Sequence, residues 1–261
     1  MLPFWLSIGV LSAVQGVLVG LPGPRAAVNL PRRLQGRWWA LVLPLSIVVV
    51  IGAIAVDSAS ADFLTWLALI AVPPLAAVAL GRVVHGARPS WALLAVPLFA
   101  VAWAAKGELG GQIAALALSG LACVTLGRVL VDVVPARWVK IGIYAMAVVD
   151  AYLVFTDLLQ HPNSVLNSAA PAADLPKLQL VDFGSALMGF GDLFIAAVLG
   201  ALLARDRDLQ LRGALLAAFL CCAWDLLFFF IDETPATVPV ALTLLTLELF
   251  RRRPLNRASR G

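Results

Sequence analysis

Residues 38–56 read WWALVLPLSIVVVIGAIAV, a run of 19 residues without a charged side chain. A helix that crosses the hydrocarbon core of a bilayer needs roughly 20 mostly apolar residues, so this run is long enough to do so. Its two Trp residues stand at one end, where Trp is typical of the interface between membrane and water. The run predicts that the chain is embedded in a membrane.

The composition of the whole chain has the same character. Of its 261 residues, 62% are hydrophobic and 13% are charged. A soluble domain has a lower apolar share and about twice this share of charged residues. The composition therefore excludes an ordinary soluble domain, a disordered chain and a disulfide scaffold. No stretch is polar enough to form a soluble body beside a membrane anchor.

Nine apolar segments can be recognised, separated by Gly, Pro and charged residues. We therefore expect an all-α polytopic membrane protein with nine transmembrane helices. Residues 1–137 would form a five-helix N-terminal scaffold, and residues 138–261 a four-helix part of the same membrane domain. The first segment lacks a basic region and a small-residue cleavage site, so we expect an uncleaved span rather than a signal peptide. The segments are residues 2–21, 38–56, 62–81, 90–105, 111–131, 138–158, 180–204, 211–231 and 235–250.

The basic residues predict the orientation of the chain. If the N-terminus is outside, 17 of the 19 Lys and Arg residues fall in cytoplasmic loops or helix ends, and Lys106 and Lys177 remain outside. Such an excess is typical of the cytoplasmic side, so we expect a cytoplasmic C-terminus. This distribution explains the net charge of +4 without a nucleic-acid partner. Arg outnumbers Lys 16 to 3, and Ala and Leu are abundant, a bias typical of GC-rich bacterial genomes. We therefore expect an integral membrane protein of a prokaryotic cell, in its inner or plasma membrane.

The Cys and His residues do not form a metal-binding pattern. Cys123, Cys221 and Cys222 all fall inside apolar segments, and His85 and His161 lie in predicted loops. Neither the spacing of zinc ligands nor a disulfide framework is present. We expect no metal and no organic cofactor.

Three carboxylates lie near the middle of predicted spans, where ionisable groups are costly and usually functional. Asp150 and Asp192 each stand 12 residues from the inner end of their segment, which corresponds to about 18 Å along a helix. Asp225 stands 14 residues deep, so depth alone leaves all three as candidates. No cation accompanies them, so we expect two of the acids to share a proton. Such a pair can act as acid and base on a water molecule and a peptide carbonyl.

The local sequence favours Asp150 and Asp192. In Gly189-Phe190-Gly191-Asp192, the two Gly residues allow another backbone to approach closely. A GxGD motif in the seventh of nine predicted spans, with an Asp in the sixth, resembles the GxGD intramembrane aspartyl proteases. These are the presenilins and signal peptide peptidases, and a bacterial or archaeal-type member is expected here. The likeness is carried by residues 149–155, 189–195 continuing to 205, and 235–239, where the family has Pro-Ala-Leu.

The resemblance implies an intramembrane endopeptidase whose substrate is a transmembrane helix within the lipid bilayer. Residues 138–261 would be its catalytic part, and the predicted orientation is similar to that of signal peptide peptidase and opposite to that of presenilin. Two residues depart from the family pattern: Val149 replaces a Tyr, whose role could move to Tyr144 or Tyr152, and Thr237 replaces a Leu. The implied catalytic residues are Asp150 and Asp192, and the implied substrate-binding residues are Gly189, Phe190, Gly191, Pro235, Ala236 and Thr237.

Other interpretations stay open. Asp150, Asp192 and Asp225 could form the relay of a proton-coupled transporter or channel. A prepilin-peptidase-like enzyme also has a GxGD motif, but the depth of the acids and the short loops argue against it. An inert relative acting as a scaffold is a weaker option. We expect Asp132, four residues after Arg128, to form a structural ion pair on one helix face.

Overall fold

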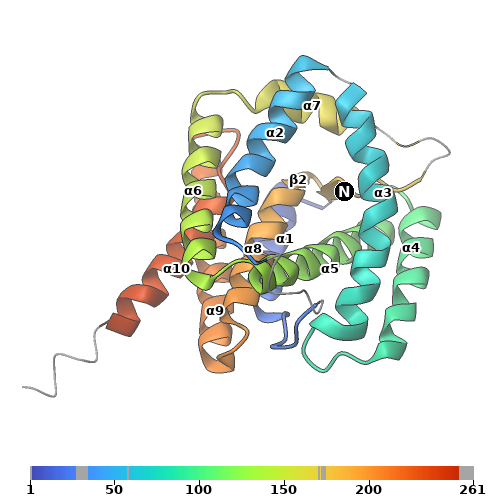
Figure 1. The fold of residues 1–261 in the computed structure, drawn as a ribbon. Helices are drawn as coiled ribbons and strands as arrows, with labels where there is room; N and C mark the ends of the chain where they lie inside the picture. The colour runs from blue at the N-terminus through green and yellow to red at the C-terminus, as the bar shows by residue number, and fades with distance from the viewer. Residues whose placement is uncertain (1, 28–34, 58, 170, 172–174, 253–261) are drawn as a thin grey trace, which may run out of the picture.

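The computed structural model describes residues 2–27, 35–57, 59–169, 171 and 175–252. Within these ranges the chain forms ten α-helices and one two-stranded antiparallel sheet (Figure 1). The helices are α1 (Phe4–Gly20), α2 (Val42–Val56), α3 (Ala59–Val78), α4 (Ala95–Ala104), α5 (Leu109–Val133), α6 (Ala136–Phe155), α7 (Gln160–Ser168), α8 (Phe190–Leu203), α9 (Arg207–Trp224) and α10 (Thr237–Arg252). The strands are β1 (Leu180–Phe183) and β2 (Ala186–Gly189).

Short helical turns of other types lengthen several of these helices. Residues Arg37–Leu41 and Pro89–Leu94 form 3₁₀ turns that lead into α2 and α4, and Asp225–Phe229 form one that follows α9. Residues Ala79–Val83 continue α3 as a π-helical turn. With these additions each of the nine predicted apolar segments contains a helix.

Five of the helical segments are long and apolar enough to cross a membrane. Three more are apolar but shorter, namely α1, the segment Pro89–Ala104 and α8. The prediction of a mainly helical protein is therefore confirmed, with five helices long and apolar enough to span a membrane, whereas nine complete spans stay a prediction. The five long segments are Arg37–Val56, Ala59–Val83, Leu109–Val133, Ala136–Phe155 and Arg207–Phe229.

The seventh apolar segment is not helical throughout, so the prediction of an all-α fold is wrong at this point. Its first ten residues form the β1–β2 hairpin, in which Leu180 lies opposite Gly189 and Phe183 opposite Ala186. Gly184 opens the two-residue loop with φ +64°, a conformation that Gly adopts without a steric penalty and that is typical of hairpin loops. Helix α8 therefore begins only at Phe190.

The stretch between the sixth and seventh segments, residues 159–179, contains a helix, α7, that the pattern of apolar segments does not predict. Its side chains Val165 and Leu166 pack against Ile54 of α2 and Ala61 of α3. The short helix therefore closes the end of the α2–α3 pair, as Figure 1 shows.

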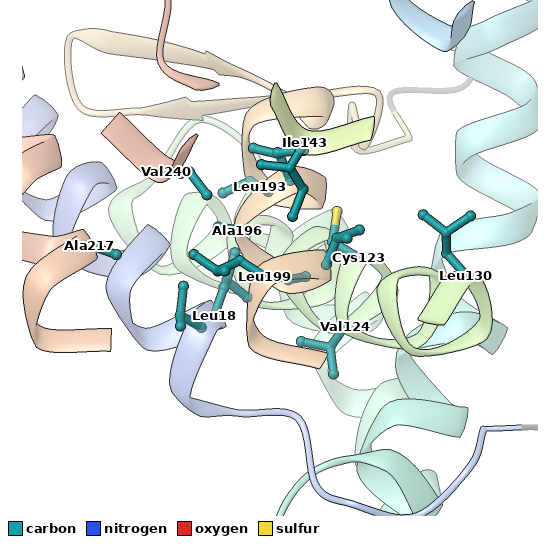
Figure 2. Packing of buried hydrophobic residues seen from close by; sticks show 14 of the residues in the cluster. Leu18, Cys123, Val124, Leu130, Ile143, Leu193, Ala196, Leu199, Ala217 and Val240 are labelled. Atoms are coloured by element: carbon teal, nitrogen blue, oxygen red, sulfur yellow. The ribbon is translucent and has the colours of Figure 1, made fainter. Parts of the chain in front are cut away.

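Helix α8 lies at the centre of the core, packed against α1 and α5. Figure 2 shows Leu193, Ala196 and Leu199 of α8 surrounded by side chains from neighbouring helices. Small residues allow these backbones to approach closely. A Cβ atom at Gly127 of α5 would lie 2.8 Å from the backbone N of Val198, and one at Gly200 would lie 2.5 Å from the carbonyl oxygen of Val19. This packing fixes the second half of α8 against α1 and α5.

The ion pair predicted on α5 is confirmed. Arg128 is 4% exposed and its Nη2 lies 2.7 Å from Oδ1 of Asp132, whose other oxygen accepts a bond from the backbone N of Ala27 at 2.9 Å. The pair therefore joins the end of α5 to the chain segment that follows α1.

The Asp132→Ala substitution should strongly destabilise the protein. It leaves the buried Arg128 guanidinium without its counter-charge, a loss that costs about 3–5 kcal/mol in comparable buried pairs. Thermal unfolding in detergent measures the effect. Asp208→Ala, which removes an exposed acid from the first turn of α9, is the control and should cost less than about 1 kcal/mol. Equal losses in both variants would contradict this account of the pair.

Candidate active site

Asp150 lies on α6 and is buried, with 5% of its surface exposed. Its Oδ2 accepts two hydrogen bonds from Thr237, one from the hydroxyl at 2.6 Å and one from the backbone N at 3.3 Å. Thr237 is the first residue of α10, so the positive end of this helix dipole faces the carboxyl group. The start of α10 thus orients the side chain of Asp150.

The sequence before α10 explains why the helix begins at this point. Pro235 precedes the helix and Pro239 lies in its first turn, where the backbone N–H groups have no partner within the helix. A Pro at these positions therefore removes no helical hydrogen bond.

The loop before α10 also carries Glu233, outside the helices. Burial raises the pKa of its carboxyl group, and a hydrogen bond with Asn163 of α7 opposes this shift. This contact ties the loop before α10 to α7.

Asp192 is the third residue of α8 and is partly buried. Its Oδ2 accepts a hydrogen bond from the backbone N of Gly189 at 3.2 Å, and so caps the helix. The sequence predicts Asp192 in the middle of a long helix, which is wrong because the β1–β2 hairpin replaces the first part of that helix. Asp192 therefore stands where a strand turns into a helix.

Asp150 and Asp192 are neighbours in the structure. Their helices α6 and α8 are in contact, and the two carboxyl groups interact electrostatically. In the described ranges, the groups that act on either carboxyl include Thr237 and Gly189 as donors but no Lys or Arg. Two acids without a cation in an apolar core form the kind of pair that can hold a single proton.

The six predicted substrate-binding residues lie at the starts of two helices. Gly189 ends β2, while Phe190 and Gly191 open α8. A Cβ atom at Gly189 would lie 3.2 Å from Oδ2 of Asp192, so a larger residue would crowd this oxygen. Pro235 and Ala236 precede α10, and Thr237 begins it. Of the six, Gly189 bonds to Asp192 and Thr237 bonds to Asp150, and the other four adjoin these two in the chain. A role of the six in binding a substrate stays a prediction.

Thr237 is a partner of Asp150 that the sequence does not predict. The sequence instead offers Tyr144 or Tyr152 as the source of a hydroxyl near this acid. In the structure Tyr144 donates to Oε2 of Glu248 at 3.4 Å, and Tyr152 is 62% exposed. The departure from the family pattern at 237 was the available signal, because a Thr can donate where a Leu cannot.

A small cavity of about 60 Å³ lies beside Asp192, among α1, α8, α9 and the loop before α10. Asp225 lines the same cavity and accepts a hydrogen bond at Oδ2 from the hydroxyl of Ser12, at 2.7 Å. Gln15, one turn further along α1, donates to the carbonyl oxygen of Asp192 at 3.3 Å. Asp225, the third candidate acid, therefore lies at the same cavity as Asp192, and α1 contacts both residues.

No group of three or more His, Cys, Asp and Glu residues suited to holding a metal ion occurs in the described ranges. Comparison with protein families, curated proteins and solved structures found no match to this chain.

Proposed function

We propose that this protein is an intramembrane aspartyl endopeptidase that hydrolyses peptide bonds within transmembrane helices. The observation that carries the proposal is the meeting of Asp150 and Asp192, without a cation, at the starts of α10 and α8. The proposal includes the nine-span arrangement with an outside N-terminus and a cytoplasmic C-terminus in a prokaryotic inner membrane. Substrates with a cytoplasmic N-terminus and an outside C-terminus would then be favoured.

In the proposed reaction one carboxyl group takes a proton from water while the other gives a proton to the leaving amide nitrogen. Thr237 donates two bonds to the same oxygen of Asp150. Hydrogen bonds of this kind favour charge on the accepting carboxylate. Asp192, with one backbone donor, is then the acid that protonates the leaving group, and Asp150 is the base that activates water.

The substrate helix must unwind before attack, because the carbonyl groups of a helix are hydrogen-bonded and shielded. The β1–β2 hairpin next to Asp192 supports a way of holding the opened strand. Within the described residues β2 pairs with β1 alone, and strand addition binds extended peptides through main-chain hydrogen bonds. Leu187 of β2 is 51% exposed and lies just before the GxGD motif. An opened substrate strand could therefore run beside β2 toward Asp192.

The direct test is cleavage of a model transmembrane peptide by the purified protein in detergent, with the products identified by mass spectrometry. Internal cleavage within the apolar segment of the peptide is expected. The absence of products from several peptides, over a range of pH values, would contradict the proposal.

A proton-coupled transporter is the second candidate, favoured by the shared cavity of Asp192 and Asp225. It predicts proton flux across proteoliposome membranes that is lost when either acid is replaced by Asn, together with no peptide cleavage. The two measurements on the same preparation distinguish the candidates.

A further inference from the structure

The cavity beside Asp192 is lined by polar groups that come from three helices. Ser12 and Gln15 lie on one face of α1 and are each 1% exposed. Ser12 holds the carboxyl group of Asp225, and Gln15 holds the backbone of Asp192. Ser12 and Gln15 of α1 therefore each bond to a residue that lines this cavity.

Trp224 supplies an independent observation. It also lines the cavity, and its indole Nε1 is buried without a hydrogen-bond partner in the protein. A buried N–H donor is costly unless it is paired, commonly with an ordered water molecule. A cavity of about 60 Å³ with several polar groups is large enough for a few water molecules. A water molecule there can accept from Trp224 and donate to a carboxylate oxygen.

We propose that this cavity binds water that connects Asp225 to Asp192, so that Asp225 relays protons to the catalytic pair. This inference rests on the proposed peptidase function. After Asp192 has given its proton to the leaving nitrogen, Asp225 gives a proton to a cavity water, and that water gives one to Asp192. Asp225 then takes a proton from solvent, and Asp150 releases the proton it took from the attacking water. One proton is taken up and one is released, so the cycle balances.

The surroundings of Asp225 suit a relay. Helix α1 carries no ionisable side chain, and α8 carries only Asp192. On α9 the thiols of Cys221 and Cys222 are the neighbouring titratable groups, and Asp150 lies beyond Asp192 on α6. The charged residues described on α10 lie toward its other end, where Glu248 pairs with Lys140 at 2.6 Å. In the described part of the chain no cation faces Asp225 to hold it permanently ionised.

The test compares the pH dependence of cleavage in wild type, Asp225→Asn and Ser12→Ala. With Asp225→Asn, kcat should fall about 10-fold or more while KM stays nearly constant. The loss should grow as pH rises, because protons to recharge Asp192 become scarce. A small diffusible acid such as imidazolium buffer should restore part of the rate, which a merely structural role of Asp225 would not permit. Ser12→Ala should shift the profile in the same direction by a smaller factor.

The matched control is Asp232→Asn, which changes an exposed acid just beyond the same end of α9. It should leave the pH profile of cleavage unchanged.

Infrared spectra of the protonated carboxyl groups, recorded against pH, provide a measurement that does not need cleavage. Replacement of Asp225 should shift the titration of the remaining acids. If this shift is observed but wild type cleaves no peptide, the peptidase proposal fails while the link between the acids stands. If wild type cleaves and Asp225→Asn changes neither profile nor spectra, the relay is overturned. If Asp225→Asn does not fold, Ser12→Ala and Trp224→Phe decide by the same two readouts.

Discussion

Asp150→Asn and Asp192→Asn should each abolish cleavage of a transmembrane peptide, with kcat lowered by about 10²–10⁴-fold. An amide has nearly the shape of a carboxyl group, but it can neither accept a proton from water nor donate one to the leaving nitrogen. Because the two residues act as a pair, the double variant should be little worse than either single variant. Initial rates with the purified proteins in one detergent, followed by peptide fluorescence, measure the effect.

The control for this experiment is Asp208→Asn, an exposed acid in the first turn of α9, away from the two acids and the hairpin. It should keep the wild-type rate. Asp192 caps α8 and Asp150 bonds to the start of α10, so both acids also contribute to the fold. A loss of rate therefore counts only in a variant that unfolds at the wild-type temperature. Full activity in a folded Asp150→Asn or Asp192→Asn protein would contradict the proposed pair. If Asp225→Asn were inactive while Asp150→Asn stayed active, the catalytic pair would be Asp192 and Asp225.

All the described α-helices except α7 fall in apolar segments that could be recognised from the sequence, because charges, Gly or Pro bound each segment. The segment 180–204 misled this reasoning, since short apolar runs fit a strand as well as a buried helix. Residues 180–189 read LVDFGSALMG, and the Gly184-Ser185 pair between two apolar runs is a hairpin signal. The continuous apolarity of the segment concealed it.

At the candidate site, too, some features could be predicted from the sequence and others could not. Asp150 and Asp192 could be selected because an acid in an apolar segment is conspicuous, and the two Gly residues of the GxGD motif distinguish one of them. The contacts that orient these acids could not be predicted, because they depend on how distant helices pack. Thr237 stands 87 residues after Asp150, and Ser12 stands 213 residues before Asp225. No local pattern links the members of either pair.

The hydroxyl of Thr237 is expected to matter for the rate more than for the fold. Thr237→Val keeps the side-chain shape but removes the donor that lies 2.6 Å from Oδ2 of Asp150. A hydrogen bond to a charged group is worth about 1.5–3 kcal/mol. Because this bond favours the charged, base form of Asp150, its loss moves the shared proton toward Asp150 and depletes the productive form of the pair. We therefore expect kcat to fall by about 10- to 100-fold with little change in KM. The backbone N–H of residue 237 remains as the second donor.

Thr237→Ser is the matched control, since it retains the hydroxyl and should keep most of the rate. The comparison separates two roles that the structure brings to one residue. A substrate-lining residue would change KM and the choice of cleaved bond, and it would respond to the loss of the methyl group in Thr237→Ser. A residue that orients Asp150 would change kcat and its pH dependence, and would respond to the loss of the hydroxyl in Thr237→Val. Wild-type kcat in a folded Thr237→Val protein would show that the bond to Asp150 contributes nothing to the reaction. The start of α10 would then serve the substrate alone.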